Sequence, residues 1–405
     1  MSHAARWLAV LRLAALGLAA LAAVGGCERG ERPRPAERLA PAAGPDERAH
    51  TRPDSDGRVG PAHAGIRCRL EAPVPILSGL PSAHAVAVAA SDTSTVVVID
   101  RDASTLLVIA TRVASGARAV PVSAPGADAL FALEALDGDR FVAITRAACP
   151  TELEAARCLF ATLLGADGRA IGTPVPIDLP GALRTSKVAG SGDTVWIARA
   201  HEGAAPRLDR LRAGEDGLTL TTIGLGDGLP LGDRPTSILG LAIAGGSWAV
   251  LFRHGGGEDP EGGVVLATQL DEHEVEALHD TIVLDSFQWY GGALSIVAAF
   301  EFARPSFLHL GADGELRGEP RRLPPGEPLP APFTTRRTAV LVGGGPRAAI
   351  EVRDGAGDRI GELVSVGTER FAFADIARRA DGFVLATATL EPDGLAIATA
   401  DLFCR

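Results

Sequence analysis

The sequence predicts an all-β fold built from a repeated unit of about 50 residues. Short apolar runs rich in Val, Ile, Phe and Trp recur along the chain, and each is followed by a charged residue. These residues are Arg101, Arg146, Arg199 and Arg253. The pentapeptide Leu-Gly-Ala-Asp-Gly occurs at 164–168 and again at 310–314. Because β-branched and aromatic residues favour strands and Asp-Gly favours tight turns, both patterns indicate short strands joined by hairpins.

Strand repeats of this length are typical of β-propeller blades. A helical solenoid repeats at a similar length, but 48 glycines and the many Val, Ile and Thr runs argue against it. The last unit, 371–405, offers three strands, and residues 66–72 can supply the fourth by pairing beside residues 402–404. We therefore predict a propeller of about seven four-stranded blades, closed by the N-terminal strand pairing with the C-terminal blade. The short unit at 338–366 leaves six blades as the alternative.

The N-terminus has the pattern of a secretory signal at residues 1–26. Arg6 and Arg12 are its only charged residues, and an apolar run too short for an ordinary membrane span follows them. The run ends in Val24-Gly25-Gly26-Cys27, which resembles the lipobox of bacterial lipoproteins. This resemblance implies cleavage before Cys27 and attachment of a diacylglycerol to its sulfur. Gly25 is uncommon at its position, so cleavage by the ordinary signal peptidase remains the alternative.

The resemblance also bears on localisation. Residue 28 is Glu rather than Asp, so the common inner-membrane retention signal of lipoproteins is missing. We expect a cell-envelope protein that is lipid-anchored, with the outer membrane favoured, at its periplasmic or its surface face.

Residues 27–64 are expected to form a lipidated tether. The segment contains six prolines and no Phe, Trp, Tyr or Ile. Such a composition cannot bury enough apolar surface to offset the entropy of ordering, so the segment is expected to be disordered. Its reach lies between about 30 Å as a coil and about 110 Å as extended polyproline. The folded domain is then residues 65–405.

Four cysteines remain after Cys27, and an even number in an exported chain indicates disulfides. Four cysteines allow three pairings. A ring closed by its terminal strands favours one bond between Cys68 and Cys404 and another between Cys149 and Cys158. Four free thiols remain the alternative.

Charge and hydropathy limit the partners. The full chain has a net charge of −11, and loss of Arg6 and Arg12 makes the mature chain more acidic. Nucleic acid is not an expected partner, because phosphate binding needs a basic face. From residue 65 on, no apolar run reaches the roughly 18 residues of a spanning helix. We expect a monomer that reaches the membrane only through its lipid anchor.

No motif predicts a catalytic residue, a metal site or a cofactor. His273, Glu274 and His279 lack the spacing of a zinc-protease helix, and no G-x-S-x-G elbow occurs. The glycine-rich stretch at 224–228 lacks the context of a nucleotide loop. The turn at 137–139, Asp-Gly-Asp, supplies too few ligands for a calcium site.

The repeat register predicts one group of candidate binding residues. Arg146, Arg199 and Arg253 end the second strand of successive blades, and His201 and His254 stand beside two of them. A rim of such side chains is suited to bind a carboxylate or an acidic partner loop. The alternative is that they are solvated charges that discourage edge pairing. In either case we expect exposed side chains, whose substitution changes stability by about 0.5 kcal/mol or less.

Two functions remain open at this point. The first is a non-catalytic binding or assembly module that uses the propeller face for a protein or a glycan. The second is an extracytoplasmic hydrolase or lyase on the same fold, since propellers host both. We favour the binding module, because the sequence shows no cluster of acids and histidines that converges on a central channel.

Overall fold

The computed structural model describes the folded domain with short gaps. The described residues are 65–101, 104–111, 118–121, 129–149, 157–178, 183–202, 204–226, 236–244, 246–255, 263–278, 281–290, 293–300, 306–322, 329–330, 337–342, 348–354, 359–366, 371–379 and 382–405. The predicted signal, Cys27 and the predicted tether lie outside these residues. Within them, regular structure is β-strand apart from one short 3-10 turn, η2 (Glu276–Leu278). A search of the same residues finds no helix long and apolar enough to cross a membrane.

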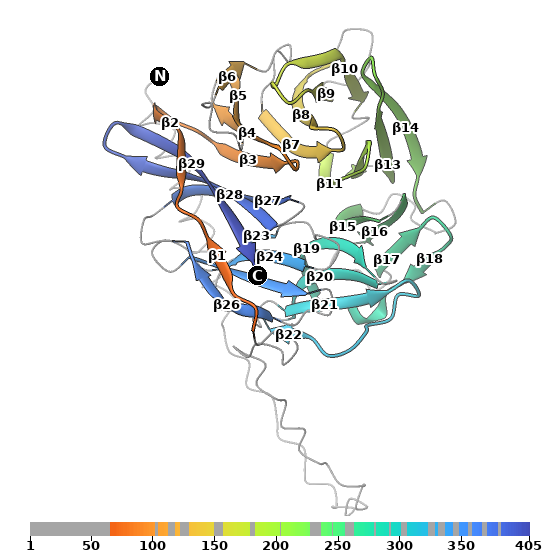
Figure 1. Ribbon diagram of the computed structural model, residues 1–405. Coiled ribbons are helices and arrows are strands. Elements are labelled where there is room, and N and C mark those ends of the chain that lie inside the picture. Colours follow the sequence, from red (N-terminus) through yellow and green to blue (C-terminus); the bar gives the residue numbers. More distant parts are fainter. Residues whose placement is uncertain are drawn as a thin grey trace, which may run out of the picture. The chain divides into compact units, whose positions relative to one another are not determined.

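The strands form antiparallel sheets that follow one another in chain order (Figure 1). The first sheet holds β3 (Ala85–Ala90), β4 (Ser94–Arg101), β5 (Ser104–Thr111) and β6 (Arg118–Pro121). The second holds β7 (Ala129–Leu136), β8 (Arg140–Ala148), β9 (Arg157–Leu164) and β10 (Ala170–Asp178). The third holds β11 (Leu183–Ser191), β12 (Thr194–His201), β13 (Ala204–Ala213) and β14 (Leu218–Gly224).

The later sheets repeat this order. The fourth holds β15 (Thr236–Ala244), β16 (Ser247–His254), β17 (Gly263–Thr268) and β18 (Glu272–Glu274). The fifth holds β19 (Thr281–Tyr290), β20 (Ala293–Phe300), β21 (Ser306–Gly311) and β22 (Arg321–Arg322). The sixth holds β23 (Leu329–Pro330), β24 (Arg337–Val342), β25 (Ala349–Asp354) and β26 (Arg359–Ser365). The seventh holds β27 (Phe371–Arg379), β28 (Gly382–Glu391) and β29 (Gly394–Cys404), with β1 (Cys68–Leu70) and β2 (Val74–Leu80).

The seventh sheet contains strands from both ends of the domain. Cys68 is paired with Cys404 and Leu70 with Leu402, so β1 lies beside the C-terminal end of β29. This is the pairing that the sequence predicted for residues 66–72. The prediction of one strand there was incomplete, because the chain continues into β2, which pairs with the earlier part of β29. The sheet therefore has five strands rather than four.

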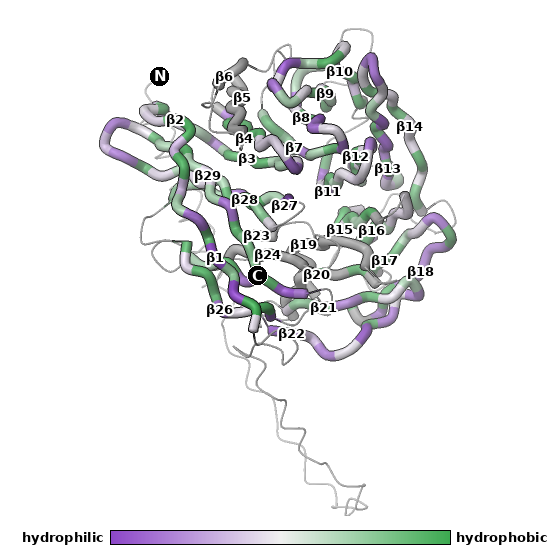
Figure 2. Tube along the Cα trace, viewed as in Figure 1, coloured by the Kyte–Doolittle hydropathy of each residue, from purple (hydrophilic) through white to green (hydrophobic). Residues whose placement is uncertain are grey.

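The core lies between the sheets. Every residue of β12 is buried, as expected for a second strand that is covered on both faces by neighbouring sheets. On one side, Val195 and Ile197 pack with Val142 and Ile144 of β8. Hydrophilic residues gather in the hairpin tips, as in the tip between β28 and β29 (Figure 2). Each Val or Ile so buried contributes about 1.5–3 kcal/mol.

Both predicted disulfides are present. Cys68 is bonded to Cys404, and Cys149 is bonded to Cys158. The first bond lies on the register pair that joins β1 to β29. The second closes a loop whose residues 150–156 lie outside the described part of the chain.

Candidate functional site

Hairpin turns from several sheets enclose a cavity of about 690 Å³. Its lining comes from the end of β3 and the turn after it (90–93), the end of β7 and the turn after it (135–139), Gly192 after β11, and residues 378–379 at the end of β27. These are the turns that follow the first strands of the first, second, third and seventh sheets. We call this space the turn cavity. A cavity of this volume accommodates a small ligand or a segment of a larger one.

The turn at 137–139 has a shape that its residues favour. Gly138 and Asp139 have φ angles of 72° and 54°, in the left-handed region where glycine and aspartate are the usual hairpin residues. The Asp139 carboxylate accepts hydrogen bonds from the hydroxyls of Ser91 and Thr93, the latter at 2.5 Å. These bonds lower the pKa of Asp139 and favour its charged form. They also join the second sheet to the first at the cavity.

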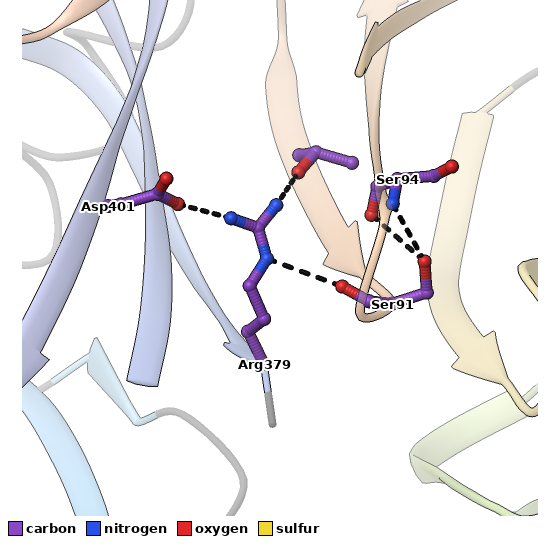
Figure 3. A network of polar contacts seen from close by, with 5 residues as sticks. Ser91, Ser94, Arg379 and Asp401 are labelled. Atoms are coloured by element: carbon purple, nitrogen blue, oxygen red, sulfur yellow. Dashed lines mark hydrogen bonds and ion pairs between the residues drawn. The ribbon is translucent and has the colours of Figure 1, made fainter. Parts of the chain in front are cut away.

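Arg379 also lines the cavity, and its bonds reach the first sheet (Figure 3). Its side chain is 4% exposed, and all three guanidinium nitrogens have partners. Nη1 lies 2.5 Å from Oδ1 of Asp401, Nη2 lies 2.5 Å from Oγ1 of Thr95, and Nε donates to the carbonyl of Ser91 at 3.3 Å. The guanidinium thus ties the seventh sheet to the first. Because it is buried and each of its three nitrogens has a partner within the protein, Arg379 holds the wall.

Other polar groups of the cavity face solvent. The side chains of Asp92, Thr93, Asp137 and Arg378 are exposed. The cavity therefore presents carboxylates, a hydroxyl and one guanidinium on a wall that the Arg379 and Asp139 bonds hold in place. Such a surface is suited to a polar ligand that accepts and donates several hydrogen bonds.

Two carboxyl groups lie on the strands that carry this wall. Glu134 of β7 accepts a hydrogen bond from the backbone N–H of Gly190 at 3.0 Å, and Asp375 of β27 accepts one from Val88 at 2.8 Å. Burial raises the pKa of Glu134 to about 7; the Gly190 bond opposes this, the charge of Asp375 adds to it, and Arg378 offsets part of it. Burial raises the pKa of Asp375 to about 6. Both groups therefore titrate near neutral pH.

The predicted rim of arginines differs from the expectation. Arg146, Arg199 and Arg253 do lie near the ends of β8, β12 and β16 in comparable register positions. Arg199, however, is 1% exposed and forms a buried ion pair with Asp209. The prediction that Arg199 is an exposed rim residue was wrong, because its charge is neutralised by a carboxylate on the neighbouring strand β13.

The buried pair belongs to a larger cluster. Arg199 Nε and Nη2 lie 2.5 and 3.2 Å from the two carboxylate oxygens of Asp209, and Thr222 donates its hydroxyl to Asp209 at 2.6 Å. Arg199 Nη1 lies 3.0 Å from Nε2 of His201, which is also buried. His201 is therefore not a rim residue either.

The remaining rim residues are half-buried. Arg253 donates from Nη2 to the carbonyl of Leu278 at 3.4 Å, and Arg146 and His254 each keep part of their surface accessible. Anion binding by these three residues stays a prediction.

Sequence reasoning missed Glu134, Asp375 and Arg378. A signal was present, because Glu134 is the single charged residue of Ala129–Leu136 and Asp375 is the single acid of Phe371–Arg379, with apolar neighbours on both sides. A buried acid in such a strand needs a hydrogen-bond donor, which points to a neighbouring backbone or to a functional site. Within the described residues, no group of three His, Cys, Asp or Glu side chains is arranged to hold a metal ion.

The chain was compared with known proteins. No protein-family model matches it, and no curated protein matches its sequence. The solved structure of polysaccharide lyase Uly1 matches with a TM-score of 0.54 and 10% identity, over 79% of this chain and 90% of that chain. The β-propeller domain of the Trilobed protease from Pyrococcus furiosus matches with a TM-score of 0.48 and 9% identity, over 78% and 95%. At these identities a likeness concerns the fold alone, and the Uly1 match is the one of the two with a TM-score above 0.5. The described strands form an all-β fold of mainly four-stranded antiparallel sheets.

Proposed function

We propose that this chain is a lipid-anchored envelope protein whose propeller binds a protein or a glycan in the turn cavity. The signal pattern at residues 1–26 and the lipobox at Cys27 support export and anchoring. The two disulfides are consistent with an oxidising compartment outside the cytoplasm. The tether then places the domain at a distance from the bilayer, with the outer membrane favoured.

The proposal includes a propeller of seven blades. Seven sheets in the described residues support this number, and the first strands of successive sheets contact one another at most junctions. The contact of β27 with β3 joins the last sheet to the first. The pairing of β1 with β29 and the Cys68–Cys404 bond support closure of the ring through the terminal strands.

The observation that carries the binding proposal is the rigidity of the turn cavity. Arg379, Ser91 and Asp139 cross-link three sheets around it, while Asp92 and Arg378 remain exposed on its surface. A ligand that binds there does not need to order the wall, and pre-organised polar groups favour affinity and specificity.

The test is capture by the mature protein. We expect the double variant Asp137→Asn/Arg378→Gln to weaken binding of an envelope protein or an arrayed glycan by about tenfold or more. Asp216→Asn is the matched control, because Asp216 is an exposed turn aspartate that does not line the cavity. Equal binding by wild type and the double variant would exclude the turn cavity as the site.

A hydrolase or lyase is the second candidate, and the titration of Glu134 favours it. A carboxyl whose pKa lies near the working pH is suited to transfer a proton in either direction. Mass spectrometry of envelope polysaccharides and peptides after incubation with the protein separates the two candidates. Cleavage products that disappear with Glu134→Gln would favour the enzyme, whereas bound but intact ligand would favour the binding module.

A further inference from the structure

The first strand of each sheet has a free edge whose N–H groups need acceptors. In several sheets a side chain of the preceding sheet supplies the acceptor, so neighbouring blades are linked by side chain-to-backbone hydrogen bonds. These bonds are Asp375 to Val88 at 2.8 Å, Asp100 to Leu130 at 3.0 Å, Glu134 to Gly190 at 3.0 Å, and Thr185 to Ile238 at 2.6 Å. Each bond gives an acceptor to a backbone N–H that would otherwise be buried without a hydrogen bond.

Two of these hydrogen bonds have their acceptor on a strand whose C-terminal end lines the turn cavity. Glu134 is followed directly by the cavity residues 135–139, and Asp375 precedes Arg378 by three positions on β27. The two carboxyls belong to the sheets that precede and follow the first sheet. Asp375 of the seventh sheet accepts a hydrogen bond from β3, and Glu134 of the second sheet accepts one from β11. Their charges act on each other, and Arg378 acts on Glu134.

Other charged groups lie on the strands packed against this pair, among them Asp100 of β4, which accepts a hydrogen bond from Leu130 of β7. The strand β3 carries no charged side chain, and β27 carries Arg378 and Arg379, the latter bound to Asp401. The strand β11 carries Arg184, which pairs with Glu202 at 3.6 Å, and Lys187. The positive charge of Arg378 favours the ionised form of Glu134, but the effect of burial is larger and raises the pKa of Glu134.

We propose that Glu134 and Asp375 make the turn cavity responsive to protons, so that proton uptake tightens the inner strands around it and proton loss loosens them. The effect on a ligand rests on the proposed function, whereas the effect on the strands does not. Both carboxyls are half-buried, so two ionised carboxylates at these positions repel each other and lack full hydration. Water entry or side-chain movement relieves this, and either change exposes the Val88 and Gly190 amides.

The direction of the pH effect on stability follows from the direction of both pKa shifts. The pKa of each carboxyl is raised in the folded chain, so its contribution to stability is complete below the ordinary carboxyl range. That contribution is lost as the pH rises through about 6 for Asp375 and about 7 for Glu134. The tight form is therefore the acidic form.

Hydrogen exchange on the mature full chain tests this without a ligand. Between pH 5 and pH 8, after correction for the intrinsic rates, we expect protection of the Val88 and Gly190 amides to fall by about tenfold or more. The Ile238 amide is the internal control, because its acceptor is the hydroxyl of Thr185, which does not titrate in this range. Its protection is expected to stay constant.

The matched variant is Glu134→Gln/Asp375→Asn, which keeps an acceptor oxygen at both positions but removes the titration. Its Val88 and Gly190 protection is expected to be independent of pH. Equal pH dependence in wild type and variant would overturn the proposal, as would constant protection of both amides in wild type.

A second measurement needs no variant. The carboxyl carbon resonances of Glu134 and Asp375, followed by isotope-edited NMR on the wild type, are expected to titrate above pH 5. Midpoints near 4 would overturn the proposal even if the variant failed to fold. None of these measurements uses a ligand, so they test the proton response even if the turn cavity binds no ligand.

Discussion

Arg379 Nη1 lies 2.5 Å from Oδ1 of Asp401, so the first and third strands of the seventh sheet are bridged across β28. The remaining guanidinium nitrogens reach Thr95 and Ser91 in the first sheet. One side chain thus holds a sheet together and attaches it to its neighbour. The position is sensitive because the guanidinium is buried and every one of its nitrogens is used.

We expect Arg379→Ala to lower the free energy of unfolding by about 3 kcal/mol, because it leaves Asp401 and Thr95 without their buried partner. Denaturant unfolding of the mature chain measures this. Arg212→Ala is the matched control, since its ion pair with Asp193 is exposed and worth less than about 1 kcal/mol. Equal losses in the two variants would contradict the assigned role.

Arg199→Glu is expected to destabilise the third sheet by about 3–5 kcal/mol or more, because it places two buried carboxylates side by side. This replaces the expectation from sequence that charge reversal here has almost no effect. Arg184→Glu, in an exposed ion pair with Glu202, is the control and is expected to change stability by about 0.5 kcal/mol. Thermal melts of both variants decide the point; an unchanged melt for Arg199→Glu would argue that the side chain is solvated.

The two disulfides are expected to differ in their contribution. The Cys68–Cys404 bond closes most of the domain, for which the chain-entropy model gives about 6 kcal/mol as an upper figure, whereas it gives about 3 kcal/mol for Cys149–Cys158. Paired Cys→Ser variants, compared by denaturant unfolding, measure both. Non-reducing peptide mapping supplies the check on connectivity, and a Cys68–Cys149 peptide would contradict it.

Stability is expected to decrease between pH 5 and pH 8 through Glu134 and Asp375, by about 2–3 kcal/mol together. Asp139 acts in the opposite sense, since its lowered pKa gives a contribution that is lost only at acid pH. Unfolding free energies across this range test the combined effect. A slope that persists in Glu134→Gln/Asp375→Asn would assign it to other groups.

Cys27 is expected to be acylated. Intact-mass analysis of the expressed protein should show a diacylglycerol-modified N-terminal cysteine, and Cys27→Ala should abolish the modification and membrane association. A mature chain that begins elsewhere, or one without lipid, would contradict the lipobox interpretation.

The sequence predicted those features that depend on local periodicity. Runs such as residues 195–197 become buried second strands because β-branched and aromatic residues pack well between sheets. The terminal disulfide was predictable because the repeat count left the last unit one strand short. The strand β2 was not predicted, since Pro75 and Gly79 obscure its pattern.

The candidate site depended on contacts that local patterns do not contain. Glu134 and Asp375 are far apart in sequence, and only the packing of β27, β3, β7 and β11 brings their charges within range. Arg199 was misassigned for the same reason: its partner Asp209 is a diagonal neighbour on the next strand, which the repeat register alone does not reveal.

The pairing of β1 with β29 also sets an order of events during synthesis. A chain that emerges N-terminus first presents β1 long before residues 394–404, so the seventh sheet waits for the last segment of the chain. During that interval β1 and the edge of β28 lack their partner, and the sheet with the longest sequence separation forms last. The rate at which the last segment emerges therefore acts on this step more than on the earlier sheets, whose strands are adjacent along the chain.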